Sequence, residues 1–259
     1  ILGGTAAVSE KVEEELSAYG KVTRIGGANR FETNLLILAE AGVAEGAEIL
    51  VCTSTNFADS LSASATGKPI LLVFNEYGKL YGKQPEFLAG LKNCTFTIIG
   101  GESAVSADLA KAIEAYGKVE RLAGANRFET SVLVAQKYFT APATAVLAYA
   151  WNYPDGLCGG SLAYSLKAPL ILTMPKYESA AVEYAAENDI TVGYVLGGEK
   201  LEVRYQFTYL TNAFTIKTAF GNLEKIANLQ GVKSVFLTPV FDPATTATPN
   251  TAASGAMTG

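Results

Sequence analysis

The decapeptide RIGGANRFET, residues 24–33, returns almost letter for letter as RLAGANRFET, residues 121–130. The similarity extends outward without a gap, so that residues 1–33 align with residues 98–130 at an offset of 97. The same offset brings Gly3, Gly100 and Gly197 into equivalent places. A period near 100 residues is far longer than the roughly 20–50 residues of a solenoid repeat, and it indicates a small folded module that occurs more than once.

Two kinds of apolar pattern alternate within one period. Short continuous apolar runs predict buried strands at residues 48–53, 69–74 and 95–101, and again at 144–150 and 169–174. Stretches with helical apolar spacing that end at a Gly predict helices at residues 30–42, 57–67 and 106–117, and the second copy repeats the order with a helix at 154–168. Strands that alternate with helices and are apolar on both faces indicate an α/β fold. We expect tandem Rossmann-like modules, each a parallel sheet with helices on both faces.

The repeat predicts a division of the chain into five parts. Residues 1–20 are the tail of a truncated module, residues 21–119 a complete module and residues 120–199 a second, incomplete one. Residues 200–243 break the pattern and predict a small α+β segment, a hairpin followed by a helix and a strand. Residues 244–259 have no apolar periodicity and predict a disordered linker. We interpret the chain as a fragment, and the change near residue 199 as a domain boundary or an artificial junction.

Composition disfavours several classes of function. A net charge of −5 and a pI near 5.0, without any basic run, argue against nucleic-acid binding. No apolar run reaches the roughly eighteen residues of a membrane span. The 259 residues include no His, the usual base for activating a Ser or Cys nucleophile and the commonest metal ligand. The three Cys have no CxxC spacing. We therefore expect no metal, no cofactor and no enzymatic activity.

Charged and amide side chains recur at the predicted carboxyl ends of strands, the edge where open α/β sheets bind ligands. The set comprises Arg24, Arg30, Glu32, Asn56 and Asp59 in the first copy, and Arg121, Arg127, Glu129, Asn152 and Asp155 in the second. Two interpretations remain open. Either Arg30 pairs with Asp59 and Arg127 with Asp155, as buried ion pairs that hold the scaffold, or the arginines bind an anionic ligand. A glycosidase-like carboxylate pair is disfavoured, because nothing in the sequence would separate the two pKa values.

Trp151 is the single tryptophan of the chain and has Thr55 as its counterpart in the first copy. It lies in a loop just before a predicted helix. Stacking on a sugar ring and packing in the core are equally compatible with this position.

The motifs R-[IL]-x-G-A-N-R-F-E-T, N-[FY]-x-D-[SG]-L and [IL]-G-G-x-x-A-V-S together resemble the cell-wall-binding repeat type 2 family of Gram-positive surface proteins. The resemblance covers residues 1–198 and places the family motif on the ten charged and amide residues above, with Gly27, Thr33, Gly124 and Thr130. It implies a secreted, often S-layer-associated protein whose three tandem modules pack as a triangle. It also implies non-covalent anchoring to an anionic secondary polymer of the wall, with neighbouring modules as further partners.

The C-terminal part resembles the later half of the pro-segment of subtilisin-like proteases. The features that carry this resemblance are Asn212 and Phe214 in the hairpin, Leu223 and Ile226 in the helix, and GVKSVF at the last strand. The resemblance implies an alternative function, that of inhibitor and folding helper, with a subtilisin-like catalytic domain as partner. A small hairpin and helix that pack on the second module are the structural alternative.

Overall fold

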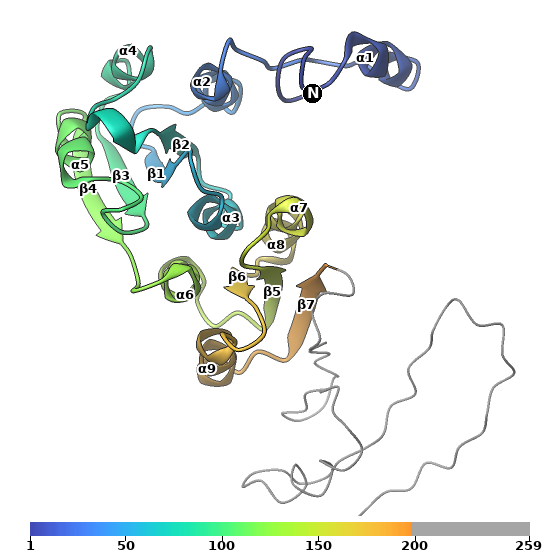
Figure 1. Cartoon of the computed structure of the whole chain (residues 1–259), viewed down its shortest axis with the longest axis vertical. Helices are drawn as coiled ribbons and strands as arrows, with labels where there is room; N and C mark the ends of the chain where they lie inside the picture. Colours follow the sequence, from blue (N-terminus) through green and yellow to red (C-terminus); the bar gives the residue numbers. More distant parts are fainter. Residues whose placement is uncertain (198–259) are drawn as a thin grey trace, which may run out of the picture. The chain divides into compact units, whose positions relative to one another are not determined.

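The computed structural model describes residues 1–197, apart from the side chain of Tyr77 (Figure 1). The predicted pro-segment-like piece, residues 200–243, and the predicted linker, residues 244–259, lie outside the described residues. The strands are β1 (Glu48–Thr53), β2 (Ile70–Val73), β3 (Cys94–Ile99), β4 (Gly117–Leu122), β5 (Thr144–Tyr149), β6 (Leu170–Thr173) and β7 (Val192–Leu196). The helices are α1 (Glu10–Ser17), α2 (Arg30–Glu40), α3 (Ala58–Ser64), the 3₁₀ turn η1 (Asn75–Tyr77), α4 (Gln84–Ala89), α5 (Ala107–Glu114), α6 (Arg127–Tyr138), α7 (Pro154–Leu157), α8 (Gly159–Leu166) and α9 (Ser179–Glu187).

The described residues form two parallel sheets. The first has the strand order β2-β1-β3-β4, and the second has the order β6-β5-β7. In both, the chain leaves the first strand toward one edge and then returns to its other side, so the order reverses between β1 and β3 and between β5 and β7. These are the topological switch points of the sheets. The predicted fold class, tandem α/β modules with parallel sheets, is confirmed.

Strand β1 is apolar on both faces because each face meets a helical layer. Ile49 and Val51 pack with side chains of α2, α4 and α5, whereas Leu50 and Cys52 pack with Ala63 of α3 and a side chain of α6. Continuous apolar runs are the expected pattern for a strand that is buried on both sides.

The two modules share helices. Val134 of α6, a helix of the second module, packs against the first sheet together with Leu50 and Ile99. In return, Leu61 of α3 joins the core of the second sheet beside Val146. Each module therefore contributes apolar side chains to the core of the other, and the described residues fold as an interlocked pair.

Polar contacts accompany this exchange at the last turn of α6. The hydroxyl of Tyr138 donates a 2.6 Å hydrogen bond to Glu48 of β1, and Lys137 pairs with Glu120 of β4. The Thr97 hydroxyl lies 3.2 Å from the Glu48 carboxylate and 2.9 Å from that of Glu120. The C-terminal end of α6 is thus bonded to β1 and β4, and Thr97 of β3 lies between the two glutamates that it contacts.

Residues 1–25 repeat the last part of the first module. Leu2 bridges Ile25 in parallel, and the Gly3 N–H donates to the Ile25 carbonyl at 2.8 Å, as the Gly100 N–H donates to the Leu122 carbonyl at 2.9 Å. Ser9 caps α1 as Ser106 caps α5. Residues 1–25 thus share these local contacts with residues 98–122. The predicted boundary at residue 120 falls inside β4, a strand that the sequence patterns had not predicted and that belongs to the first sheet.

Glycines of the second module make room for α3 of the first. A Cβ atom added to Gly160 of α8 would lie 2.1 Å from Ser64 Oγ, and one added to Gly156 would lie 2.9 Å from Leu61 Cδ1. In the first copy, serines occupy the equivalent places, Ser64 and Ser60. Close approach of the two modules therefore depends on small residues that only the second copy has.

Substitution Gly160→Ala is expected to lower the free energy of unfolding by about 1–3 kcal/mol, because the added methyl group overpacks the contact with Ser64. Thermal unfolding followed by circular dichroism measures the change. In a chain that already carries Ser64→Gly, the substitution Gly160→Ala should lower the free energy of unfolding by less than it does in the unaltered chain. Strict additivity of the two single changes would show that these residues do not meet.

Candidate functional site

The recurring decapeptide builds a capped helix start. The Asn29 side chain accepts hydrogen bonds from the backbone N–H groups of Phe31 and Glu32, both at 3.0 Å. The Glu32 carboxylate in turn accepts from the N–H of Ala28 at 3.0 Å. The second copy has the same bonds, made by Ala125, Asn126, Phe128 and Glu129. This is a reciprocal cap in which Glu32 and Glu129 satisfy the turn before the helix. The Asn at the cap and the Glu three residues later could have been recognised from the sequence.

Gly27 and Gly124 are required by close approach to this helix start. A Cβ at Gly27 would lie 2.4 Å from Glu32 Cβ, and one at Gly124 would lie 2.4 Å from Glu129 Cβ. The N–H of each glycine donates to a threonine hydroxyl, Thr33 at 2.9 Å or Thr130 at 3.1 Å. Because these N–H groups are bonded within the turn, the motif does not present them to an anionic ligand.

The first arginine of each copy holds the loop after a neighbouring strand. Arg24 donates to the Gly3 carbonyl at 3.0 Å, and Arg121 donates to the Gly100 carbonyl at 2.8 Å. Arg24 also forms an ion pair with Glu13 at 2.7 Å, and Arg121 donates to the Val105 carbonyl at 2.7 Å. Several donors of these two arginines are therefore engaged by the scaffold.

The second arginine of each copy reaches the end of the central strand. Arg30 donates to the Ser54 carbonyl at 2.6 Å, and Arg127 donates to the Ala150 carbonyl at 2.7 Å. The predicted ion pairs of Arg30 with Asp59 and of Arg127 with Asp155 are wrong, since neither is among the ion pairs of the described residues. A backbone carbonyl takes the place of the carboxylate.

Arg127 instead acts on Asp59 of the other module. Burial raises the pKa of Asp59 to about 6, and the positive charge of Arg127 partly offsets this rise. Burial likewise lowers the pKa of Arg127, and Asp59 counteracts that shift. The electrostatic partner that the sequence interpretation placed within one module thus lies across the module boundary.

Asp59 and Asp155 lie at the two switch points. A Cβ on Gly100, which follows β3, would be 2.5 Å from Asp59 Oδ2, and one on Gly197, which follows β7, would be 2.9 Å from Asp155 Oδ2. The two glycines have positive φ angles of 107° and 116°. Each aspartate therefore sits in the crevice where open α/β sheets bind ligands. Asp59 is partly buried, whereas Asp155 is exposed.

The two predicted asparagines are exposed and make local turn contacts. Asn56 Oδ1 accepts from the N–H of Ala58 at 3.2 Å, and Asn152 Oδ1 accepts from the N–H of Tyr153 at 3.0 Å. Their side-chain NH₂ groups donate no hydrogen bond within the described part of the chain. These amides remain available to a ligand at the carboxyl edge.

Aromatic side chains surround Arg127 in the second module. The guanidinium carbon lies 4.0 Å from the centre of the Trp151 ring. Phe128 meets Trp151 edge-on at 6.5 Å and stacks on Tyr177 at 5.2 Å. Phe57 of the first module contacts Tyr153 at 5.5 Å between ring centres. Trp151 is half-exposed, so its indole is not part of the buried core.

Among residues 1–197, no three His, Cys, Asp or Glu side chains are grouped so as to hold a metal ion. Helix α3 begins at the first switch point with Asp59 in its first turn. That carboxylate stands where a nucleotide-binding fold presents N–H groups to phosphate.

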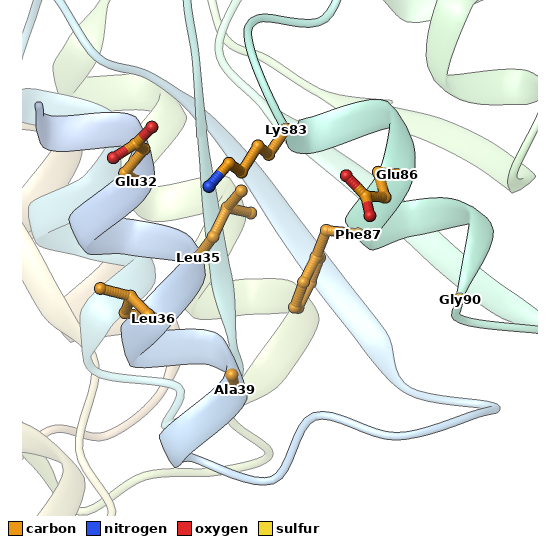
Figure 2. A pocket seen from close by; sticks show the side chains of 8 residues that line it. All are labelled: Glu32, Leu35, Leu36, Ala39, Lys83, Glu86, Phe87 and Gly90. Atoms are coloured by element: carbon orange, nitrogen blue, oxygen red, sulfur yellow. The ribbon is translucent and has the colours of Figure 1, made fainter. Parts of the chain in front are cut away.

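A groove of about 490 Å³ lies elsewhere, between α2 and α4. Figure 2 shows Leu35 and Phe87 facing each other across it, with Lys83 extending from the start of α4 toward α2. Of the residues predicted for the site, only Glu32 lines this groove, and its carboxylate already serves the helix cap. The candidate site therefore remains the carboxyl edge.

The family Cell wall binding domain 2 (CWB2) matches residues 24–110 and 121–201. The chain belongs to this family. Each of the two matched segments contains one copy of the decapeptide, with its two arginines, and one of the two switch-point aspartates, Asp59 or Asp155.

Relatives of the chain include two proteins of Bacillus subtilis (strain 168). The amidase enhancer is 27% identical over 198 residues, which are 75% of this chain and 26% of the relative. The N-acetylmuramoyl-L-alanine amidase LytC is 28% identical over 181 residues, 67% of this chain and 34% of the relative. The chain thus spans about a quarter to a third of the length of these relatives.

Two solved structures from Clostridium difficile share the fold. Cwp6 matches with a TM-score of 0.65 and 26% identity, and Cwp8 with 0.65 and 31%. Each comparison covers 78% of this chain, and respectively 33% and 35% of the other one. The resemblance to cell-wall-binding surface proteins is confirmed. No helix among the described residues of this CWB2 chain is long and apolar enough to cross a membrane.

Substitution Gly100→Ala is expected to destabilise the first CWB2 module by about 1–3 kcal/mol, because alanine is strained at this positive φ and its methyl group meets Asp59. Gly101→Ala is the matched control, since a Cβ there meets no atom within 4 Å and the residue has no positive φ. Thermal unfolding of both variants measures the difference. Equal melting temperatures would contradict the tight contact at the switch point.

Substitution Asp59→Asn is expected to change how stability depends on pH. The unfolded carboxyl group loses its proton near pH 4, whereas the folded one keeps it to about pH 6. Between these values the folded state binds more protons, so the free energy of unfolding should fall by about 2–3 kcal/mol as pH rises. Asp59→Asn should lose this slope and be the more stable protein above pH 6.

Chemical denaturation at a series of pH values measures this slope. Burial acts to raise the pKa of Glu48, but its hydrogen bonds with Lys68 and Tyr138 lower the pKa overall, and the contact with Lys137 lowers the pKa of Glu120. The contribution of these two groups to stability therefore changes at lower pH and with the opposite sign. Parallel profiles for the unaltered chain and Asp59→Asn would contradict the assignment.

Proposed function

We propose that this CWB2 chain anchors a surface protein to the cell wall by binding an anionic secondary polymer, with Arg30 and Arg127 as contacts. The observation that carries the proposal is that the Arg30 side chain is exposed and has few hydrogen-bond partners. Its side chain is exposed at the carboxyl edge, and its one hydrogen bond within residues 1–197 runs from Nη1 to the Ser54 carbonyl. The remaining N–H groups suit the fork geometry with which arginine binds phosphate or carboxylate oxygens.

The contrast between the two arginine positions supports this choice. Arg24 and Arg121 are each held by two scaffold groups, whereas Arg30 and Arg127 each donate one hydrogen bond, to a backbone carbonyl, and Arg127 also lies over the Trp151 ring. One bond orients the guanidinium and leaves further donors for a ligand. Since Arg30 and Arg127 belong to different modules, a polymer with repeating charges can engage both, and avidity then exceeds the affinity of either contact.

The chain has a net charge of −5 and as a whole repels an anion. An anionic ligand must therefore be attracted by a few positive groups close to where it binds. Arg30 and Arg127, each at the carboxyl edge of its own sheet, supply a positive potential over a short range, since charges farther apart than about 8 Å are screened at physiological ionic strength. We therefore expect weak binding per site that decreases as salt is added.

The proposed role is positioning rather than catalysis. Two relatives are a wall amidase and an amidase enhancer, and the matched region is a minor part of each. The absence of His from the 259 residues also disfavours the common hydrolytic mechanisms. We propose that the chain holds a neighbouring functional region at the cell surface. The resemblance of residues 200–243 to a protease pro-segment stays a prediction.

Substitution Arg30→Ala is expected to weaken retention on purified cell walls by about tenfold, the loss expected for a charge-assisted hydrogen bond. The melting temperature should change little, because the side chain is exposed and forms no ion pair in the described chain. Co-sedimentation with walls that retain the polymer and with walls stripped of it measures binding.

Lys11→Ala is the matched control, since it removes one exposed positive charge from α1. It should bind walls as the unaltered chain does. Equal retention on intact and stripped walls would refute the polymer as ligand. A lowered melting temperature of Arg30→Ala with unchanged retention would assign Arg30 to the scaffold instead.

A further inference from the structure

Three half-exposed aromatic side chains gather at the carboxyl edge of the second sheet. Trp151 and Tyr153 follow β5, and Tyr177 follows β6; their exposed fractions are 51%, 49% and 54%. The three residues come from two loops of one module and carry large apolar rings to the surface. The buried core of the second module is formed by other side chains. Packing of this module therefore does not explain why these three rings are at the surface.

Neighbouring side chains fix the orientation of these rings. Arg127 lies over the Trp151 ring, and Phe128, which is buried, contacts both Trp151 and Tyr177. Phe57 of the first module holds Tyr153. The rings are thus held by the start of α6 and by a loop of the other module. A rigid aromatic surface binds with less loss of conformational freedom than a mobile one.

Polar groups with unused hydrogen-bonding capacity adjoin the rings. Within the described residues, Arg127 donates one hydrogen bond, to the Ala150 carbonyl, and the Asn152 amide donates none. Glu178, next to Tyr177 in the chain, has a carboxylate oxygen that is shielded from solvent and has no hydrogen-bond partner in this part of the protein. A buried acceptor without a partner costs free energy.

The first module lacks this arrangement although it shares the supporting ring pair. Phe31 contacts Tyr81 at 4.7 Å, as Phe128 contacts Tyr177. Thr55, however, stands in the place of Trp151, and Gly82 follows Tyr81 where Glu178 follows Tyr177. The aromatic surface and the unpaired carboxylate therefore belong to the second module alone.

We infer that Trp151, Tyr153 and Tyr177, with Arg127 and Asn152 at their side, form a subsite for a pyranose ring of a wall carbohydrate. The axial C–H groups of a pyranose present a flat apolar face to an aromatic ring, and its hydroxyl groups pair with amide, guanidinium and carboxylate groups. This combination of flat rings and a few planar polar groups matches a sugar better than an apolar peptide, which would leave the polar groups unpaired. The inference rests on the proposed wall-binding function and names the part of the ligand that the second module contacts.

Trp151 allows a direct test because it is the single tryptophan of the chain. The full chain is titrated with two probes prepared from the same walls, glycan strands freed of the secondary polymer and the released secondary polymer itself. Binding at the subsite should give a saturable change in indole fluorescence and should protect Trp151 from quenching by acrylamide. The probe that produces both effects identifies which wall carbohydrate supplies the ring.

Substitution Trp151→Thr installs the residue of the first module and is expected to weaken binding of the active probe about tenfold or more, as truncation of a central aromatic contact does. Trp151→Phe should retain part of the affinity. Tyr19→Ala removes an aromatic side chain of α1 that is 91% exposed and should bind as the unaltered chain does. Calorimetric titration measures all three, and thermal unfolding confirms that each variant is folded.

The outcomes separate the subsite from the anchoring function. If the unaltered chain binds a probe without any change at Trp151, and Trp151→Thr binds equally well, the subsite is refuted while wall binding stands. If neither probe nor the intact wall is bound, the proposed function itself fails. Acrylamide protection of Trp151 before any probe is added would show that another part of the protein covers the ring, and that result would also overturn the inference.

Discussion

The structure depends on an exchange of helices between the two modules. Leu61 of α3 is buried in the core of the second sheet, and Val134 of α6 is buried on the first. Burial of side chains of this size stabilises a fold by roughly 1.5–3 kcal/mol each relative to exposure. Because both sheets need a helix from the other module, neither core is complete without its neighbour. The two modules are therefore one interlocked body rather than two independently folded domains.

The second copy of the decapeptide has a direct part in this exchange. The motif forms the capped start of α2 and of α6, and α6 is the helix that the two sheets share. Its asparagine and glutamate satisfy the first N–H groups, its glycine permits close approach of the loop, and its second arginine reaches the end of the central strand. A helix start fixed in this way sets where the rest of the helix meets each sheet. Most polar groups of the motif form hydrogen bonds that fix this geometry. The guanidinium of the second arginine is the group that keeps N–H donors without a partner in the described chain.

Sequence reasoning predicted the fold class and the helices and strands with strong apolar patterns, because the period of 97 and the continuous apolar runs report burial directly. It did not predict β4, whose GKVERL sequence alternates polar and apolar residues at the edge of the sheet. It paired Arg127 with Asp155 because those residues share a copy, whereas the charge that Arg127 meets is Asp59 of the other one. Contacts between modules leave no periodic signal in one copy, so the sequence of a single repeat cannot reveal them.

The differences between the copies show how a repeated sequence acquires unequal roles. Where the first copy has Ser64 and Thr55, the second has Gly160 and Trp151. The first change makes room for the neighbouring module, and the second adds an aromatic ring beside an arginine. Both lie where the modules meet or at the edge beside that contact. At the first switch point, Asp59 is desolvated and interacts with the charge of Arg127 from the second module. Exposed binding capacity is left to the outer parts of the carboxyl edge, at Arg30 in the first module and around Trp151 in the second.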